Sequence, residues 1–188
     1  MSKTLFRTVV AFSLLTLALL CGNGCANVSV TMQSNKDPGA MHQVKRLYVI
    51  IDQGVLENQP TSKRIDEQLK SAVLVASLRN CLSNTPLQLE IGIVNPLALN
   101  GQDFETKIRE FQADAVLVCK LKNVVVNQFG GCPTIYYDAS LFNEITHKYV
   151  WRALIKNSGD PFAMDQRTRR MAETIVAQLR ADGLIEPQ

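Results

Sequence analysis

Residues 44–52 read VKRLYVIID, and this stretch decides the fold of the chain. Its apolar core, LYVII at 47–51, is rich in β-branched side chains, which predicts a strand buried on both of its faces. Strands of this kind occur inside sheets that carry a parallel pair. We therefore expect residues 44–52 to form an inner strand, with the other elements arranged around it.

The rest of the chain alternates between helix and strand and then forms a meander. Residues 28–32 alternate in polarity and predict a further short edge strand before the inner one. The order β-α-β-α-β-β-β-α indicates an α+β domain whose mixed β-sheet ends in an antiparallel three-strand meander, with the helices packed mainly on one face. The expected helices are Thr61–Leu82, 103–113 and 165–182, and the other strands are 87–93, 115–127, 134–142 and 148–156.

The helix expected over Thr61–Leu82 is apolar on nearly all sides. One stripe at helical spacing contains Ile65, Leu69, Ala72, Val73 and Ala76, whereas Leu74, Val75, Leu78 and Leu82 fall outside it. Such a helix is covered on more than one side. The cover is either another helix of the same domain or a protein partner, which includes a second copy of the chain.

Alternation in the meander predicts both its faces and its register. With Asn143 opposite His147, one face carries the charged row Lys122, Asp138 and Arg152, and the other face places Ala139 between Leu121 and Trp151 in the core. Tyr149 is expected on the Trp151 face. In the last helix, Met171, Ile175 and Leu179 are expected to point inward, and Arg167, Arg170 and Arg180 are expected to form a solvated outer face.

The beginning of the chain has the features of an export signal. Lys3 and Arg7 precede twelve mostly apolar residues, 9–20, which are too few for the roughly 20 that a spanning helix needs. Small residues then lead to Cys25, as in the lipobox of bacterial lipoproteins, which this segment resembles. We expect residues 1–24 to be a lipoprotein signal peptide and Cys25 to carry the lipid. An ordinary secretory signal cut near Gly24 is the alternative.

The length and composition of the mature chain are those of one ordinary globular domain. Residues 25–42 are expected to form a lipidated tether, and residues 43–188 a single periplasmic α+β domain. Without the signal, 18 basic residues stand against 17 acidic ones, so the charge implies no nucleic-acid partner. Three cysteines remain besides Cys25. A disulfide between Cys81 and Cys119 is one interpretation, and two buried free thiols are the other.

Motifs of enzymes and cofactor sites are absent from the sequence. It contains no phosphate-binding loop, no dinucleotide-binding glycine pattern, no GxSxG, no HExxH and no CxxC. His42 and His147 are far apart, and Cys132 is expected about nine strand residues, or ~30 Å, from His147. We therefore expect no catalytic residue, no cofactor and no metal site.

Several segments together resemble a known family. Cys25, the VSV at 28–30, Asp37-Pro38 and the inner strand, followed late in the chain by 137–141, 146–148 and 150–152, are similar to the small envelope lipoproteins of the DUF4136 type. More distantly they are similar to the amino-terminal domain of TolB and to the lipoproteins of polysaccharide and curli export. The resemblance implies an outer-membrane anchor on the periplasmic side and a structural or protein-interaction role. A subunit of a transport or secretion complex and a small-molecule binding domain are the alternatives.

Overall fold

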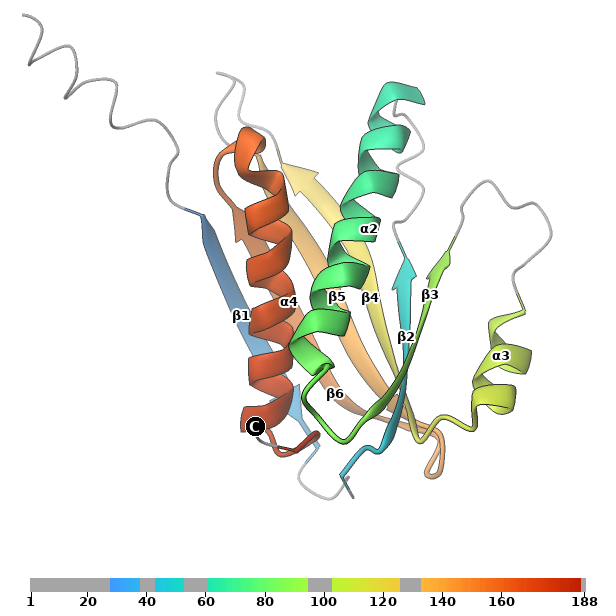
Figure 1. Ribbon diagram of the computed structural model, residues 1–188. Coiled ribbons are helices and arrows are strands. Elements are labelled where there is room, and N and C mark those ends of the chain that lie inside the picture. The colour runs from blue at the N-terminus through green and yellow to red at the C-terminus, as the bar shows by residue number, and fades with distance from the viewer. Residues whose placement is uncertain (1–27, 38–42, 53–60, 95–102, 126–132, 187–188) are drawn as a thin grey trace, which may run out of the picture.

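The computed structural model describes residues 28–37, 43–52, 61–94, 103–125 and 133–186. They form the α+β architecture expected from the sequence, a six-stranded mixed sheet in the order β1-β6-β5-β4-β2-β3 (Figure 1). The strands are β1 (Ser29–Lys36), β2 (Arg46–Asp52), β3 (Gln88–Val94), β4 (Ala115–Val125), β5 (Thr134–Asn143) and β6 (Lys148–Ser158). The helices are α2 (Thr61–Leu82), α3 (Phe104–Phe111), the short 3-10 helix η1 (Pro161–Ala163) and α4 (Met164–Ala181).

The inner strand predicted from the sequence is β2. It pairs in parallel with β3 on one side and with β4 on the other. Leu47 and Val49 are fully buried, and Tyr48 is 2% exposed. The carboxylate of Asp114, just before β4, accepts hydrogen bonds from the backbone N–H groups of Lys45 (3.0 Å) and Arg46 (2.9 Å). This contact fixes the start of β2 against β4.

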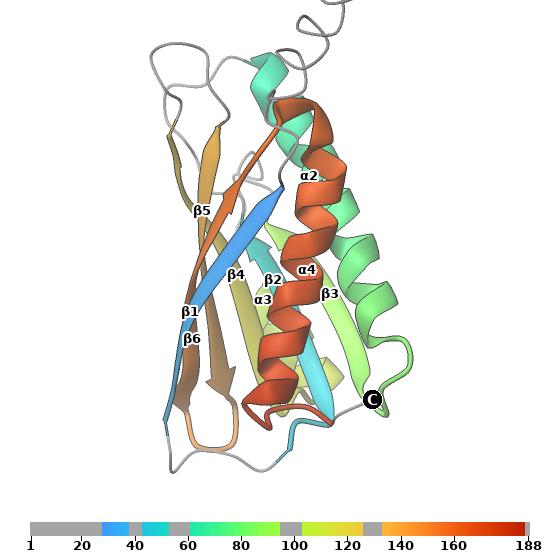
Figure 2. The same ribbon diagram turned by 90° about the vertical axis from the view of Figure 1, so that its left-hand side faces the viewer.

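The helices cover both faces of the sheet unequally. α2 and α4 lie side by side on one face, as Figures 1 and 2 show. α3 packs on the opposite face, because Phe111 contacts the Tyr48 ring edge-on with 6.0 Å between centroids. A Cβ atom at Gly92 would lie 2.6 Å from Cε1 of Phe104, so this position in β3 must stay a glycine for α3 to pack so closely.

The covered face of α2 differs from the predicted stripe. Leu74, Leu78 and Leu82 are buried beside α4 and the sheet, while Ala72 and Ala76 are exposed. Burying leucines removes more apolar surface from water than burying alanines, which favours this rotation of the helix. The side chains of Thr61–Lys70, which the predicted stripe also included, lie outside the described residues. Another helix of the same domain, α4, is therefore the cover of the described part of α2.

The register of the meander is shifted by two residues from the prediction. Asp138 lies opposite Leu154 and not opposite Arg152. The predicted placement of Ala139 between Leu121 and Trp151 is likewise wrong, since its neighbours are Cys119 and Ala153.

Turn length and a bulge account for the shift between β5 and β6. Asn143 accepts the N–H groups of Ile145 and Thr146, and it pairs with Lys148 across a turn of residues 144–147. An extra residue, Val150, then bulges from β6. A shift of two residues preserves alternation, so the predicted faces are correct for the buried Trp151 and Ala139 and for the exposed Asp138 and Arg152.

The edge strand β1 is longer than the predicted segment at 28–32. It pairs antiparallel with β6 from Ser29 to Lys36, so it includes residues 33–36, which were expected to belong to the tether. Lys36 donates a hydrogen bond from Nζ to the backbone carbonyl of Asp182, just after α4. The bonds to β6 and this contact outweigh the weak strand preference of the sequence SNK.

The last helix confirms its predicted core side and corrects one arginine. Met171, Ile175 and Leu179 point inward and are about 1% exposed or less. Arg167, expected outside, is fully buried. Arg170 is exposed, and Arg180 is partly buried with a hydrogen bond to the carbonyl of Cys81 (3.0 Å). The helix stops before Gly183, whose φ is +67°.

Candidate protein-interaction site

Apolar and cationic side chains gather around the β5–β6 turn, which lies at the same end of the molecule as the end of α4 (Figure 1). We call Phe142, Ile145, Tyr149 and Arg152 the turn patch. Ile145 is 73% exposed and Tyr149 is 51% exposed. The Phe142 and Tyr149 rings meet edge-on with 5.2 Å between centroids, and Cζ of Arg152 lies 4.5 Å from the Tyr149 centroid. Tyr149 is therefore held between a ring and a guanidinium group in an exposed position.

The bulge at Val150 creates this patch. Val150 and Trp151 are both buried, although they are adjacent in a strand, so Tyr149 falls on the outer face of the sheet. The expectation that Tyr149 shares a face with Trp151 is thus wrong. The sequence signal was present but slight: Tyr149, Val150 and Trp151 are three large apolar residues in a row, which breaks simple alternation.

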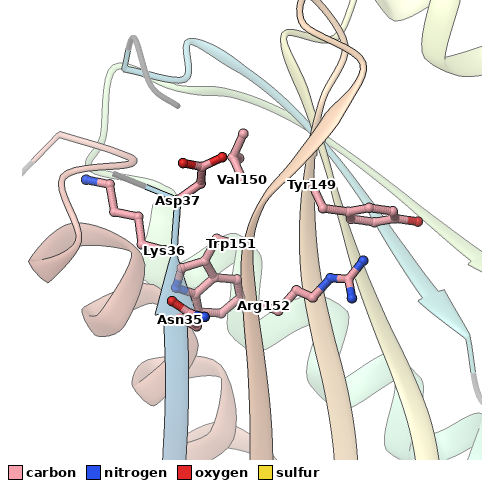
Figure 3. A pocket seen from close by; sticks show the side chains of 7 residues that line it. All are labelled: Asn35, Lys36, Asp37, Tyr149, Val150, Trp151 and Arg152. Carbon is pink, nitrogen blue, oxygen red and sulfur yellow. The ribbon is translucent and has the colours of Figure 1, made fainter. Parts of the chain in front are cut away.

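A shallow pocket of about 330 Å³ adjoins the patch (Figure 3). Asn35, Lys36 and Asp37 line it from β1 and the residue after it, and residues 149–152 line it from β6. The N–H of Asp37 donates to the carbonyl of Val150 (3.0 Å), which ties β1 to the bulge. The lining combines an aromatic ring with charges of both signs, a composition that suits a polar partner group.

The pocket is supported from behind by Asp182. Its carboxylate accepts hydrogen bonds from Nε1 of Trp151 (2.7 Å) and from Nε2 of Gln178 (3.1 Å). Lys36 donates to the main-chain carbonyl of the same residue, where the end of α4 favours positive charge. These contacts join β1, β6 and α4, so the pocket is built on regular elements that are fixed to one another.

On the outer face of the described part of the sheet, two lysines lie within ion-pair distance of aspartates. Lys122 lies 3.3 Å from Asp138, although Lys120 and not Lys122 stands directly opposite Asp138 in the sheet, and Lys120 lies 3.3 Å from Asp52. Arg152 does not join the predicted charged row, because its guanidinium group stacks on Tyr149. Both lysine side chains are more than half exposed, so water screens these pairs and each contributes little to stability.

The two cysteines of the predicted disulfide are free thiols. Cys119 is buried in the core on β4, and burial raises the pKa of its thiol to about 12. Cys81 is partly buried near the end of α2, and burial also raises the pKa of its thiol. A neutral thiol is a poor nucleophile, so neither cysteine is prepared for covalent chemistry. Cys132 lies outside the described residues.

Of the two histidines, only His147 lies in the described part of the chain. His147 ends the β5–β6 turn with a φ of +52° and lies beside Phe142, with 6.3 Å between ring centroids. His42 and Cys25 lie outside the described residues. Within the described ranges, no three His, Cys, Asp or Glu side chains are grouped so that they could hold a metal ion. No helix of the same ranges is long and apolar enough to cross a bilayer.

Comparisons with known proteins support the fold. No protein-family model and no curated protein sequence matches the chain, so the resemblance to DUF4136 lipoproteins stays a prediction. A PelC dodecamer from Paraburkholderia phytofirmans, in a single-substitution form, is similar with a TM-score of 0.50 and 14% identity over 84% of this chain and 100% of that one. Another PelC dodecamer from that organism gives 0.49 and 15%, covering 85% and 100%. Lipoprotein GNA1162 from Neisseria meningitidis gives 0.41 and 13%, covering 73% and 99%.

Proposed function

We propose that this chain is a lipid-anchored protein of the bacterial cell envelope that acts by binding another protein through the turn patch. The contact of the half-buried Phe142 ring with the exposed Tyr149, on which Arg152 stacks, carries the proposal. Aromatic side chains and arginine are enriched at protein interfaces, and they supply most of the binding energy there. Because Tyr149 is already held by its neighbours, little side-chain entropy remains to be lost when a partner binds.

The proposed lipid anchor and its membrane rest on the sequence, and the proposed partners rest partly on the similarity of the fold. Cys25 would carry the lipid, and Ala26 after it, where the sorting rule of bacterial lipoproteins looks for Asp, favours the periplasmic side of the outer membrane. The PelC structure that this fold resembles is a dodecamer. A second copy of the chain is therefore one partner to test, and a subunit of a transport or secretion complex is another. No catalytic step is part of the proposal.

Site-specific photocrosslinking in intact cells tests this function. A photoreactive phenylalanine analogue at Ile145 should give an adduct, whereas the same analogue at Glu173, exposed on α4, should not. Tyr149→Ala should lower the Ile145 adduct at least fivefold with an unchanged melting temperature. An adduct of twice the chain mass indicates self-association. No adduct from either position in folded protein would contradict the proposal.

The pocket beside the patch supports a second candidate, a small-molecule binding domain. Its lining by Asp37, Tyr149 and Arg152 offers one aromatic face and both charges to a polar metabolite. Native mass spectrometry of protein purified from its own membranes separates the two functions. A bound metabolite that is lost in Arg152→Ala, without any Ile145 adduct, would favour the second candidate.

A further inference from the structure

Phe162 is exposed to an unusual degree for a large apolar side chain. It is 97% exposed, although it belongs to the regular helix η1. Its N–H donates to Oδ1 of Asp160 (2.9 Å), and the next N–H, of Ala163, donates to the main-chain carbonyl of Asp160 (3.1 Å). The ring is thus presented to solvent on a fixed turn, where it makes almost no contact with the rest of the protein.

The strand β1 begins at the same end of the domain. Ser29 pairs with Ser158, four residues before Phe162, and Figure 1 shows β1 and α4 beginning at this end. Val28 is 8% exposed, and its carbonyl accepts a hydrogen bond from Nη1 of Arg170 (3.1 Å). The point where the chain joins the domain is therefore held beside the first turns of α4.

The length of the intervening chain limits the distance between Val28 and a lipid on Cys25. Cys25 precedes Val28 by three residues, which span at most about 11 Å when fully extended. A lipid on Cys25 would hold this end of the domain against the bilayer surface. The opposite end, with Ile145, would face away from the membrane, because the 11 residues of β6 separate the two ends by about 35 Å.

The other exposed side chains at this end include one apolar residue and charged residues of both signs. Val125, at the end of β4, is 44% exposed and pairs with Thr134, which in turn pairs with Ser158. The exposed charged residues at the start of α4 are of both signs, Asp165 and Arg169 among them. This end therefore offers an aromatic ring to lipid without a strong attraction to anionic headgroups.

We propose that Phe162 inserts into the lipid bilayer and, together with the lipid on Cys25, holds the domain upright with the turn patch directed away from the membrane. This inference rests on the proposed lipid anchor. It assigns a second membrane contact to a residue that has no role in the core. An aromatic ring at the headgroup level is stable there because its apolar body leaves water.

Tryptophan quenching tests the insertion in the complete lipidated protein. The natural chain has a single tryptophan, Trp151, which is 1% exposed. Phe162→Trp and the matched control Ile145→Trp are placed in vesicles of phosphatidylethanolamine and phosphatidylglycerol with brominated acyl chains. We expect the fluorescence emission of Phe162→Trp to shift to shorter wavelength. The intensity that the new tryptophan adds to that of Trp151 should fall by about half. Ile145→Trp should behave as it does in unbrominated vesicles, and high salt should change neither result.

The outcomes separate this inference from the function on which it rests. Radiolabelled fatty acid is measured on Cys25 in the same preparations, and absence of label would overturn the proposed anchor. Label on Cys25 with no quenching of Phe162→Trp would overturn the insertion alone. A blue shift without quenching would mean that a protein covers Phe162, which also overturns it. Equal quenching of both variants would show that the domain has no fixed orientation.

Discussion

Arg167 shows how a single charged residue can organise a fold. Its guanidinium group is fully buried and donates to Oδ1 of Asn157 (3.0 Å) and to three main-chain carbonyls, those of Asn157 (2.7 Å), Gly159 (3.0 Å) and Pro133 (2.8 Å). Burial lowers the pKa of Arg167, although an arginine stays charged even so. The guanidinium fork thus joins the start of β5, the end of β6 and the start of α4.

The spacing of Arg167 in the sequence already indicates that it is buried. Arg167 precedes Met171 by four residues, as Met171 precedes Ile175, so helical geometry puts all three on the buried stripe. The prediction gave more weight to the rule that arginines face water. That rule fails where carbonyl groups left over at strand ends need donors, and such groups are not visible in a sequence.

Replacing Arg167 by lysine should destabilise the domain by about 2–4 kcal/mol. Lysine keeps the charge but loses the planar fork, so buried carbonyl groups would be left without a partner. Urea unfolding followed by Trp151 fluorescence measures the change. Arg169→Lys, at an exposed position on the same helix, is the control and should stay within about 0.5 kcal/mol of the wild type. Equal stability of the two variants would contradict the role assigned to the fork.

Trp151 and Asp138 test whether the faces of the meander are assigned correctly. Trp151→Ala removes a buried ring and its bond to Asp182, so we expect a loss of roughly 3–5 kcal/mol. Asp138→Ala breaks an ion pair whose two side chains are each more than half exposed, so its cost should stay within about 1 kcal/mol. Thermal melts followed by circular dichroism measure both. A small loss of stability in Trp151→Ala together with a large loss in Asp138→Ala would mean that the faces are reversed.

At the level of elements, the sequence predicted which helices and strands form but not how they meet. Polarity alternation and the turn residues located the strands of the described ranges, except for the second half of β1, and β2 was identifiable as an inner strand from its LYVII run. The rotation of α2 was not predictable, because its apolar residues surround the helix and only the position of α4 selects among them. The register of β5 with β6 depends on the bulge at Val150, which alternation alone does not reveal.

The described half of α2 provides a direct test of that rotation. Leu78 is fully buried, so Leu78→Ala should cost about 2–5 kcal/mol. Ala76 is exposed, and Ala76→Glu should change stability by less than about 0.5 kcal/mol. The same Ala76→Glu variant tests the predicted partner contact on this helix, because a charge there would disrupt a protein interface without harming the fold. Chemical denaturation measures the stability, and the same photoreactive analogue placed at Arg79, which is exposed one turn further along α2, measures the partner contact.

The whole molecule has two chemically different ends. One end contains the start of β1 and the exposed Phe162, and the other contains the turn patch with its pocket. α2, α4 and the sheet enclose the core between the ends. The candidate site could not be predicted from the sequence, because the pocket combines the end of β1 with the start of β6, more than a hundred residues later. The anchor, in contrast, depends on a local motif that sequence can reveal.

Cys25→Ser is the decisive variant for the anchor. Without the thiol no lipid can be attached, so the protein should accumulate as an uncleaved precursor or as a soluble periplasmic form. Cys21→Ser should change little, because Leu20 before it is too bulky for the small-residue cleavage position. Incorporation of radiolabelled fatty acid, followed by membrane fractionation, measures both variants. Label that survives in Cys25→Ser would mean that the lipid is attached at another residue. The orientation proposed for Phe162 would then lose its basis, because it depends on an attachment within about 11 Å of Val28.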